Sequence, residues 1–129
     1  MKPRLLFLLI PLLIAFVTIG AQLKRLPPKL STTDLMKAKL TASQKVLEGI
    51  ATEDFNGISR NASLLAGYSQ TAGWLADQSP AYRQHTTEFR RQALALAKEA
   101  RRQNLDGATV AYFQLTVSCV NCHKYMRAK

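Results

Sequence analysis

Two cysteines and a histidine near the carboxyl end of this 129-residue chain have the types and spacing for covalent chemistry. They belong to the pentapeptide Cys119-Val120-Asn121-Cys122-His123, which holds both cysteines of the sequence. Two thiols at this spacing can add to the two vinyl groups of a haem, and the imidazole beside the second thiol can bind the iron. On a helix the three side chains fall within one turn. The motif therefore predicts one covalently bound haem (heme c), with thioethers at Cys119 and Cys122 and with His123 as the proximal iron ligand.

Other uses of these residues fit the sequence less well. A thioredoxin-like dithiol belongs in a βαβ context, which this sequence does not show. A structural zinc ion needs four ligands, and the only further candidate is His85. A local disulfide leaves His123 without a role. Thiol redox chemistry, a disulfide and a metal site are therefore kept as alternatives to haem attachment.

The rest of the sequence predicts the helices that position the motif. After residue 30 apolar residues recur with the period of an α-helix, and the strict alternation of strands is not found. Four helices are expected: from the capping residues 31–33 to about residue 50, from about residue 52 to 75, from Ser79-Pro80 to about residue 103, and from about residue 108 onward. Residues 104–107 are expected to form a turn. Short connections make neighbouring helices antiparallel, which predicts an all-α, up-down four-helix bundle with the motif on its last helix.

Each predicted helix has an apolar stripe that should face the core. The residues expected on these stripes are Met36, Leu40, Ser43, Leu47 and Ile50 in the first helix, Phe55, Ile58, Ala62, Leu65 and Ala72 in the second, Phe89, Ala93, Leu96 and Ala100 in the third, and Tyr112, Leu115, Cys119, Cys122 and His123 in the fourth.

The first 21 residues have the character of a secretory signal. A short basic end, with Lys2 and Arg4, precedes an uncharged apolar run that ends in the small residues Gly20 and Ala21. The run is close to the shortest that spans a bilayer as a helix, so an uncleaved membrane anchor is the alternative to a cleaved signal peptide. Residues 22–31 are expected to be a linker, and residues 32–129 to be the haem domain. Either alternative predicts a domain outside the cytoplasm, in the periplasm or exported.

Composition and charge narrow the function classes. Hydrophobic residues make up 47% of the chain and charged residues 20%, which excludes both a disordered chain and a polytopic membrane protein. The 18 Lys and Arg against 8 Asp and Glu give a formal net charge of +10, which favours anionic partners. Nucleic acid is not an expected partner of an exported haem protein. The basic residues of the third helix form either a solvated face or a docking face for an acidic redox partner or an anionic membrane; they are Arg83, Arg90, Arg91, Lys98, Arg101 and Arg102.

The haem motif on the last helix of such a domain resembles the cytochrome c′ family of class II c-type cytochromes. The resemblance covers about residues 33–127 and rests on Leu35-Met36-Lys37 early in the first helix, on the C-terminal motif and on Arg127. It implies a four-helix bundle, a contact of Arg127 with a haem propionate or the haem edge, and a homodimer formed through the first two helices. The sequence departs from the family at Thr32, where many members have an arginine near a propionate. Arg127, Lys124 and Lys37 are the candidates to replace it.

The iron ligand opposite His123 decides between two functions. Met36 is the candidate, because Met1 belongs to the leader and Met126 lies only three residues past His123. The resemblance supports it, since low-spin members of the family place their methionine ligand at this position. A histidine and a methionine as axial ligands predict a monohaem cytochrome that transfers single electrons, and no enzymatic turnover.

The second function follows if Met36 is only core packing. A pentacoordinate iron under an apolar residue, Leu35 or Leu40, predicts a protein that binds nitric oxide or carbon monoxide. A peroxidase-like enzyme would need a distal histidine or arginine, and the sequence has neither near Met36.

Overall fold

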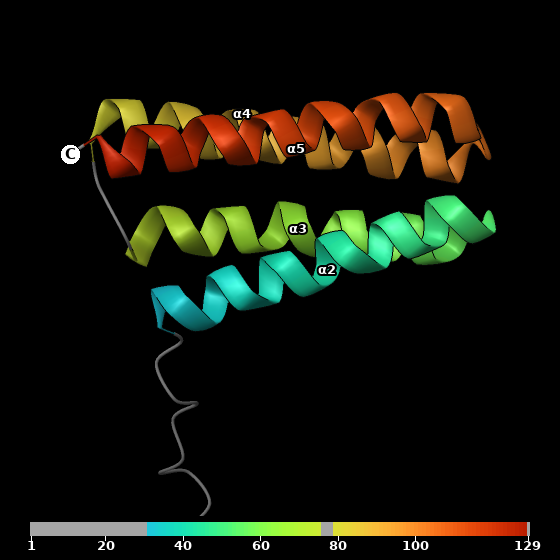
Figure 1. Ribbon diagram of the computed structural model, residues 1–129, viewed down its shortest axis with the longest axis horizontal. Coiled ribbons are helices and arrows are strands. Elements are labelled where there is room, and N and C mark those ends of the chain that lie inside the picture. Colours follow the sequence, from blue (N-terminus) through green and yellow to red (C-terminus); the bar gives the residue numbers. More distant parts are fainter. Residues whose placement is uncertain (1–30, 76–78, 129) are drawn as a thin grey trace, which may run out of the picture.

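The computed structural model describes residues 31–75 and 79–128, except for the side chains of residues 72–75. These residues form four α-helices and no strand: α2 Thr32–Thr52, α3 Phe55–Leu75, α4 Pro80–Arg101 and α5 Leu105–Arg127. Figure 1 shows the helices lying lengthwise beside one another, each running opposite to the one before it in the chain. The predicted all-α, up-down four-helix fold is therefore confirmed. The predicted leader and the linker up to residue 30 lie outside the described residues.

The starts of α2 and α4 are set by the side chains that the sequence indicated. The Ser31 side chain accepts a hydrogen bond from the backbone N–H of Asp34 at 3.1 Å. Ser79 does the same for Tyr82 at 3.2 Å, and Pro80 occupies the first position of α4. Such caps satisfy backbone donors that have no partner inside the helix. Both predicted starts are confirmed. They could be predicted because each cap involves residues close together in the sequence.

The connection between α4 and α5 is shorter than predicted. The expected turn over residues 104–107 is wrong, since α5 begins at Leu105. Asn104 is its N-cap, and its side chain accepts a hydrogen bond from the backbone N–H of Gly107 at 3.1 Å. The chain reverses instead at Gln103, whose φ of 56° is left-handed. A cap at Asn104 therefore makes the residues after it the first turn of the helix.

The core lies along the centre of the bundle, and the stripes predicted for α3 and α4 are found in it. Its largest fully buried side chains are Leu35, Val46, Ile58, Leu65, Leu96 and Leu115. Phe89, Ala93 and Ala100 of α4 are also buried. Ala72 belongs to the residues whose side chains are not described. Of the neighbouring helix pairs, α2 and α5 are in the least extensive contact.

The predicted buried face of α2 is wrong. The buried residues of this helix are Leu35, Ala42, Val46 and Gly49. Leu40 and Leu47 are 61% and 53% exposed, and the other predicted positions are only half-buried. The reason is close packing on α3, since a Cβ at Gly49 would lie 2.8 Å from Cγ1 of Ile58. The small residues of α2 therefore face the bundle, and two of its leucines face outward.

This packing predicts opposite effects for two glycine substitutions. Gly67→Ala should stabilise the fold by up to about 1 kcal/mol, because nothing lies within 4 Å of the added Cβ and alanine favours a helix. Gly49→Ala should destabilise it by about 1–3 kcal/mol through overpacking against Ile58. Thermal unfolding followed by circular dichroism measures both, with about 4–8 °C expected per kcal/mol in a domain of this size. Equal shifts of the same sign would contradict the packing of α2 on α3.

Candidate functional site

The last turns of α5 present the two cysteines toward the bundle and the histidine toward solvent. Cys119 and Cys122 are free thiols and both are half-buried. Cys119 packs against the hydrophobic core, whereas His123 is exposed. The three residues lie within one turn of α5, as the motif predicts. This arrangement leaves both thiols available at the inner side of the helix and the imidazole at its outer edge.

Lys39 of α2 lies beside these thiols. Its Nζ is 4.5 Å from the centre of the Phe89 ring of α4, a cation–π contact. The same ammonium acts electrostatically on Cys119 and on Cys122. Lys39 makes no ion pair with a carboxylate within residues 31–75 and 79–128. Three helices therefore meet at the motif, and one of them contributes a half-buried cation without an acidic partner.

The surroundings of the thiols disfavour charge. Burial raises the pKa of Cys119 and of Cys122, and the Lys39 ammonium acts against this rise. Burial also lowers the pKa of Lys39, against the attraction of the two thiolates. In all three groups burial is the larger cause, as expected where little water reaches the charged form. The thiols are therefore shielded from water, and the half-buried Lys39 ammonium lies near them.

The pairing of α2 with α5 places Met36 at the level of Cys119. The hydroxyls of Ser43 and Tyr112 lie 3.2 Å apart, and the Tyr112 hydroxyl also donates to the Ser43 carbonyl oxygen at 3.3 Å. Met36 precedes Ser43 by seven residues, and Cys119 follows Tyr112 by seven. Because the helices are antiparallel and rise equally per residue, these two positions lie at the same height. The half-buried Met36 is thus at the same end of the bundle as the motif.

The carboxyl end of α5 is tied to the start of α4. The Tyr125 hydroxyl lies 3.1 Å from the Ser79 hydroxyl, and the Tyr125 ring is 5.1 Å from the His85 ring. In the part of the chain that is described, no three residues among His, Cys, Asp and Glu lie close enough together to hold a metal ion. The His85 set considered for zinc is therefore not assembled among these residues. The contacts of Tyr125 hold the last turns of α5 in place beside α4.

The cation that the fold brings to the thiols is not one of those expected. Arg127 and Lys124 are exposed in the last turn of α5, and Lys37 is exposed on α2. Lys39 lies one turn before Ser43, on the side of α2 that meets α5, and no pattern of neighbouring residues in the sequence marks it as close to the cysteines.

The two cysteines fit covalent attachment of a haem, whereas the exposed His123 imidazole lies at the outer edge of α5. The cysteines are free and lie three residues apart on one inner face, as attachment to two vinyl groups requires. Burial of both thiols keeps water from the place where the macrocycle would attach. This fit rests on the chemistry of the side chains at one end of the bundle.

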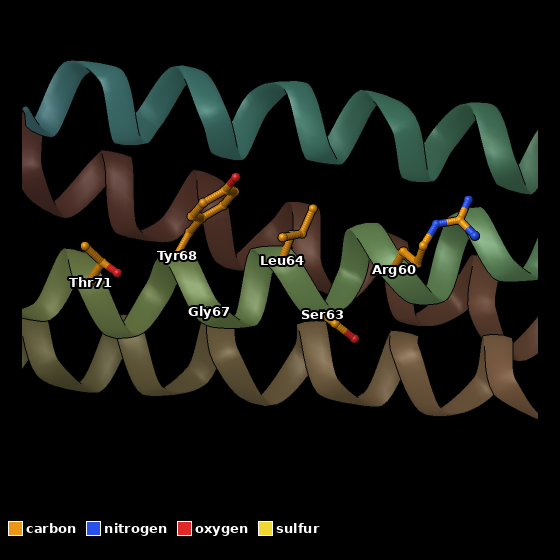
Figure 2. A pocket seen from close by; sticks show the side chains of 6 residues that line it. All are labelled: Arg60, Ser63, Leu64, Gly67, Tyr68 and Thr71. Atoms are coloured by element: carbon orange, nitrogen blue, oxygen red, sulfur yellow. The ribbon is translucent and has the colours of Figure 1, made fainter. Parts of the chain in front are cut away.

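A pocket of about 460 Å³ lies on α3, on elements other than those of the motif. Figure 2 shows Leu64, Tyr68 and Arg60 on its wall, with Tyr68 directed toward α2. Ser63, Gly67 and Thr71 complete the lining. No carboxylate, thiol or imidazole is among these residues. The pocket therefore adds no chemistry to the site on α5.

Comparison of the chain with protein-family models, curated proteins and solved structures gave no significant match. Within the described ranges, none of the helices is both long and apolar enough to cross a membrane.

The electrostatics predict that Lys39 controls the reactivity of the haem-free thiols. Lys39→Met should raise the pKa of Cys119 further, because it removes the positive charge that favours the thiolate. Less thiolate means slower alkylation by iodoacetamide at mildly alkaline pH. The rate is measured by mass spectrometry of the folded, haem-free chain.

Lys37→Met is the matched control for this measurement, since it removes the same charge from an exposed position of the same helix. It should leave the alkylation rate unchanged. Equal slowing in both variants would show that the effect comes from net charge and not from the place of Lys39.

Proposed function

We propose that the chain is a c-type cytochrome with one covalently attached haem, which carries single electrons outside the cytoplasm. The observation that carries the proposal is the placement of Cys119 and Cys122, half-buried and three residues apart, on the inner face of α5, with His123 in the same turn. The apolar run at residues 5–21 supports export. Outside the cytoplasm, where conditions are oxidising, two neighbouring thiols that carried no haem would form a disulfide.

The roles of the side chains follow from their chemistry. Each thiol would add across one vinyl group, the sulfur to one carbon and the hydrogen to the other, so no oxidant or reductant is consumed. His123 would bind the iron, and Met36 of α2 is the second axial ligand that we propose. When bound, the haem supplies an iron that takes up and releases one electron. A methionine ligand raises the potential of that step.

The charge of the bundle suits an acidic partner. Arg91 of α4 is paired with Glu88 at 2.7 Å, and Arg102, which caps the end of α4, is paired with Glu99 at 3.7 Å. Other basic residues of the helix are exposed as well; they include Arg90, Lys98 and Arg101. A surface of this sign speeds encounter with an acidic redox protein or an anionic membrane, and added salt weakens the effect.

One observation favours a second function. Met36 lies at the edge of the buried face of α2, whereas its neighbour Leu35 is fully buried. An iron without a methionine ligand would be pentacoordinate and would bind nitric oxide or carbon monoxide. The choice between an electron carrier and a gas-binding protein therefore depends on Met36.

Covalent attachment is the first test. Produced together with the haem-maturation machinery, the wild type should retain one haem through denaturation and extraction, and its mass should rise by one haem. A variant with both Cys119→Ser and Cys122→Ser should carry no covalent haem, because no thioether can form. Gln114→Ala, an exposed change on the same helix away from the motif, should keep it. A wild type without covalent haem, or a variant without either cysteine that is loaded like the wild type, would refute the proposal.

Absorption spectra with and without carbon monoxide distinguish the two functions. The wild type should be low-spin and insensitive to carbon monoxide, and Met36→Ala should become high-spin and bind it. Leu40→Ala is the control, since Leu40 is one turn away on the same helix and 61% exposed. A wild type that is high-spin and binds carbon monoxide at once would make the gas-binding function the correct one.

A further inference from the structure

The outer side of α5 carries a row of exposed apolar residues. Val110, Phe113, Val117 and Val120 are 58%, 70%, 41% and 45% exposed. Their spacing of three and four residues places them along one line of the helix. Single exposed apolar residues are common on protein surfaces, but a continuous row marks a surface that is covered by a partner. We call these four residues the α5 row.

The α5 row lies opposite the face that α5 turns to the bundle. The buried residues of this helix are Ala108, Ala111, Leu115 and Ser118. They alternate with the members of the row along the sequence and lie on the opposite side of the helix. Both cysteines lie on or next to this inner face. A partner on the α5 row would therefore leave both thiols on the opposite side, and the inference does not depend on the proposed function.

Charged residues close the row at both ends. Asp106 precedes Val110 by four residues, and Lys124 follows Val120 by four, so both continue the same line. No lysine, arginine, aspartate or glutamate occurs between them in the sequence of α5. Both are exposed. The row thus has a negative end, an apolar middle and a positive end.

We propose that the partner on this row is a second copy of the chain, with the two α5 helices antiparallel across a two-fold axis. The row is symmetric about position 115. Val110 then faces Val120 of the second copy, and Phe113 faces Val117. The same register brings Asp106 against Lys124, and two-fold symmetry makes each of these contacts twice. A single helix that is complementary to itself in both charge and apolar spacing fits its own copy.

The neighbouring helix widens the surface. Leu40 and Leu47 lie one turn before and one turn after Ser43, whose hydroxyl meets Tyr112 of α5. They therefore lie toward the α5 side of α2, and they are 61% and 53% exposed. A row on one helix is narrow for a stable dimer, which buries about 800 Å² on each partner. The two leucines supply further apolar area beside the row.

This interface differs from the one that the family resemblance implies. A dimer through the first two helices would cover α2 and α3, including Leu64, which is 49% exposed on the wall of the α3 pocket. Among the described side chains of α3, the only large exposed hydrophobic residue is Leu64, so this part of the helix has no comparable apolar row. The two arrangements therefore predict different sensitivity to mutation.

Sedimentation and light scattering of the purified full chain, over a range of concentrations, test the proposal. The wild type should be a dimer. Phe113→Glu should raise the dissociation constant at least about tenfold, because it places a charge in the centre of both copies of the contact. Leu64→Glu, the matched control on α3, should leave the dimer intact. Circular dichroism of each variant shows that the fold is retained.

Charge reversal tests the register. Asp106→Lys alone should weaken the dimer because it faces Lys124 of the second copy, and adding Lys124→Asp should restore it. A chain that is monomeric at all concentrations would overturn the proposal. So would a dimer that Leu64→Glu disrupts and Phe113→Glu leaves intact, because the contact would then lie on the first two helices.

Discussion

The register of α2 against α5 is the constraint on which the rest of the molecule depends. It is marked by the paired hydroxyls of Ser43 and Tyr112, a half-buried contact between two helices that otherwise touch little. One sliding step of either helix would break this pair. The same register brings Met36 to the height of Cys119 and sets Lys39 beside the thiols. The chemistry proposed for this end of the bundle therefore requires a contact near its middle.

The rotation of α2 about its axis decides which of its residues lie near the thiols and which lie beside the α5 row. Ala42 and Gly49 allow α2 to pack closely on α3, and this choice of buried face turns the rest of the helix. Lys39 then lies inside the bundle, and Leu40, one residue later, lies outside. The inner side gives the thiols an unpaired cation. The outer side adds apolar area next to the α5 row.

Two opposite faces of α5 both consist of uncharged residues. Its inner face must fit the core and the thiols, so it carries small side chains at Ala108 and Ala111. Its outer face has no charge between Asp106 and Lys124, although the molecule as a whole is strongly basic. The positive charge lies on α4 instead, where Arg90 and Lys98 are exposed. This separation permits self-association on one side and attraction of an acidic partner on another.

The sequence by itself determined the features that depend on neighbours along the chain. Caps at Ser31 and Ser79 start two helices, and the spacing of Cys119, Cys122 and His123 puts them in one turn, because these interactions span only a few residues. Only the tertiary structure decided which face of α2 is buried, since its apolar residues form two overlapping stripes and packing against α3 selects one. The place of Lys39 was decided in the same way. Lys39 lies near Phe89 and the two thiols, which are far from it in the sequence. A pattern of neighbouring residues cannot predict that these groups meet.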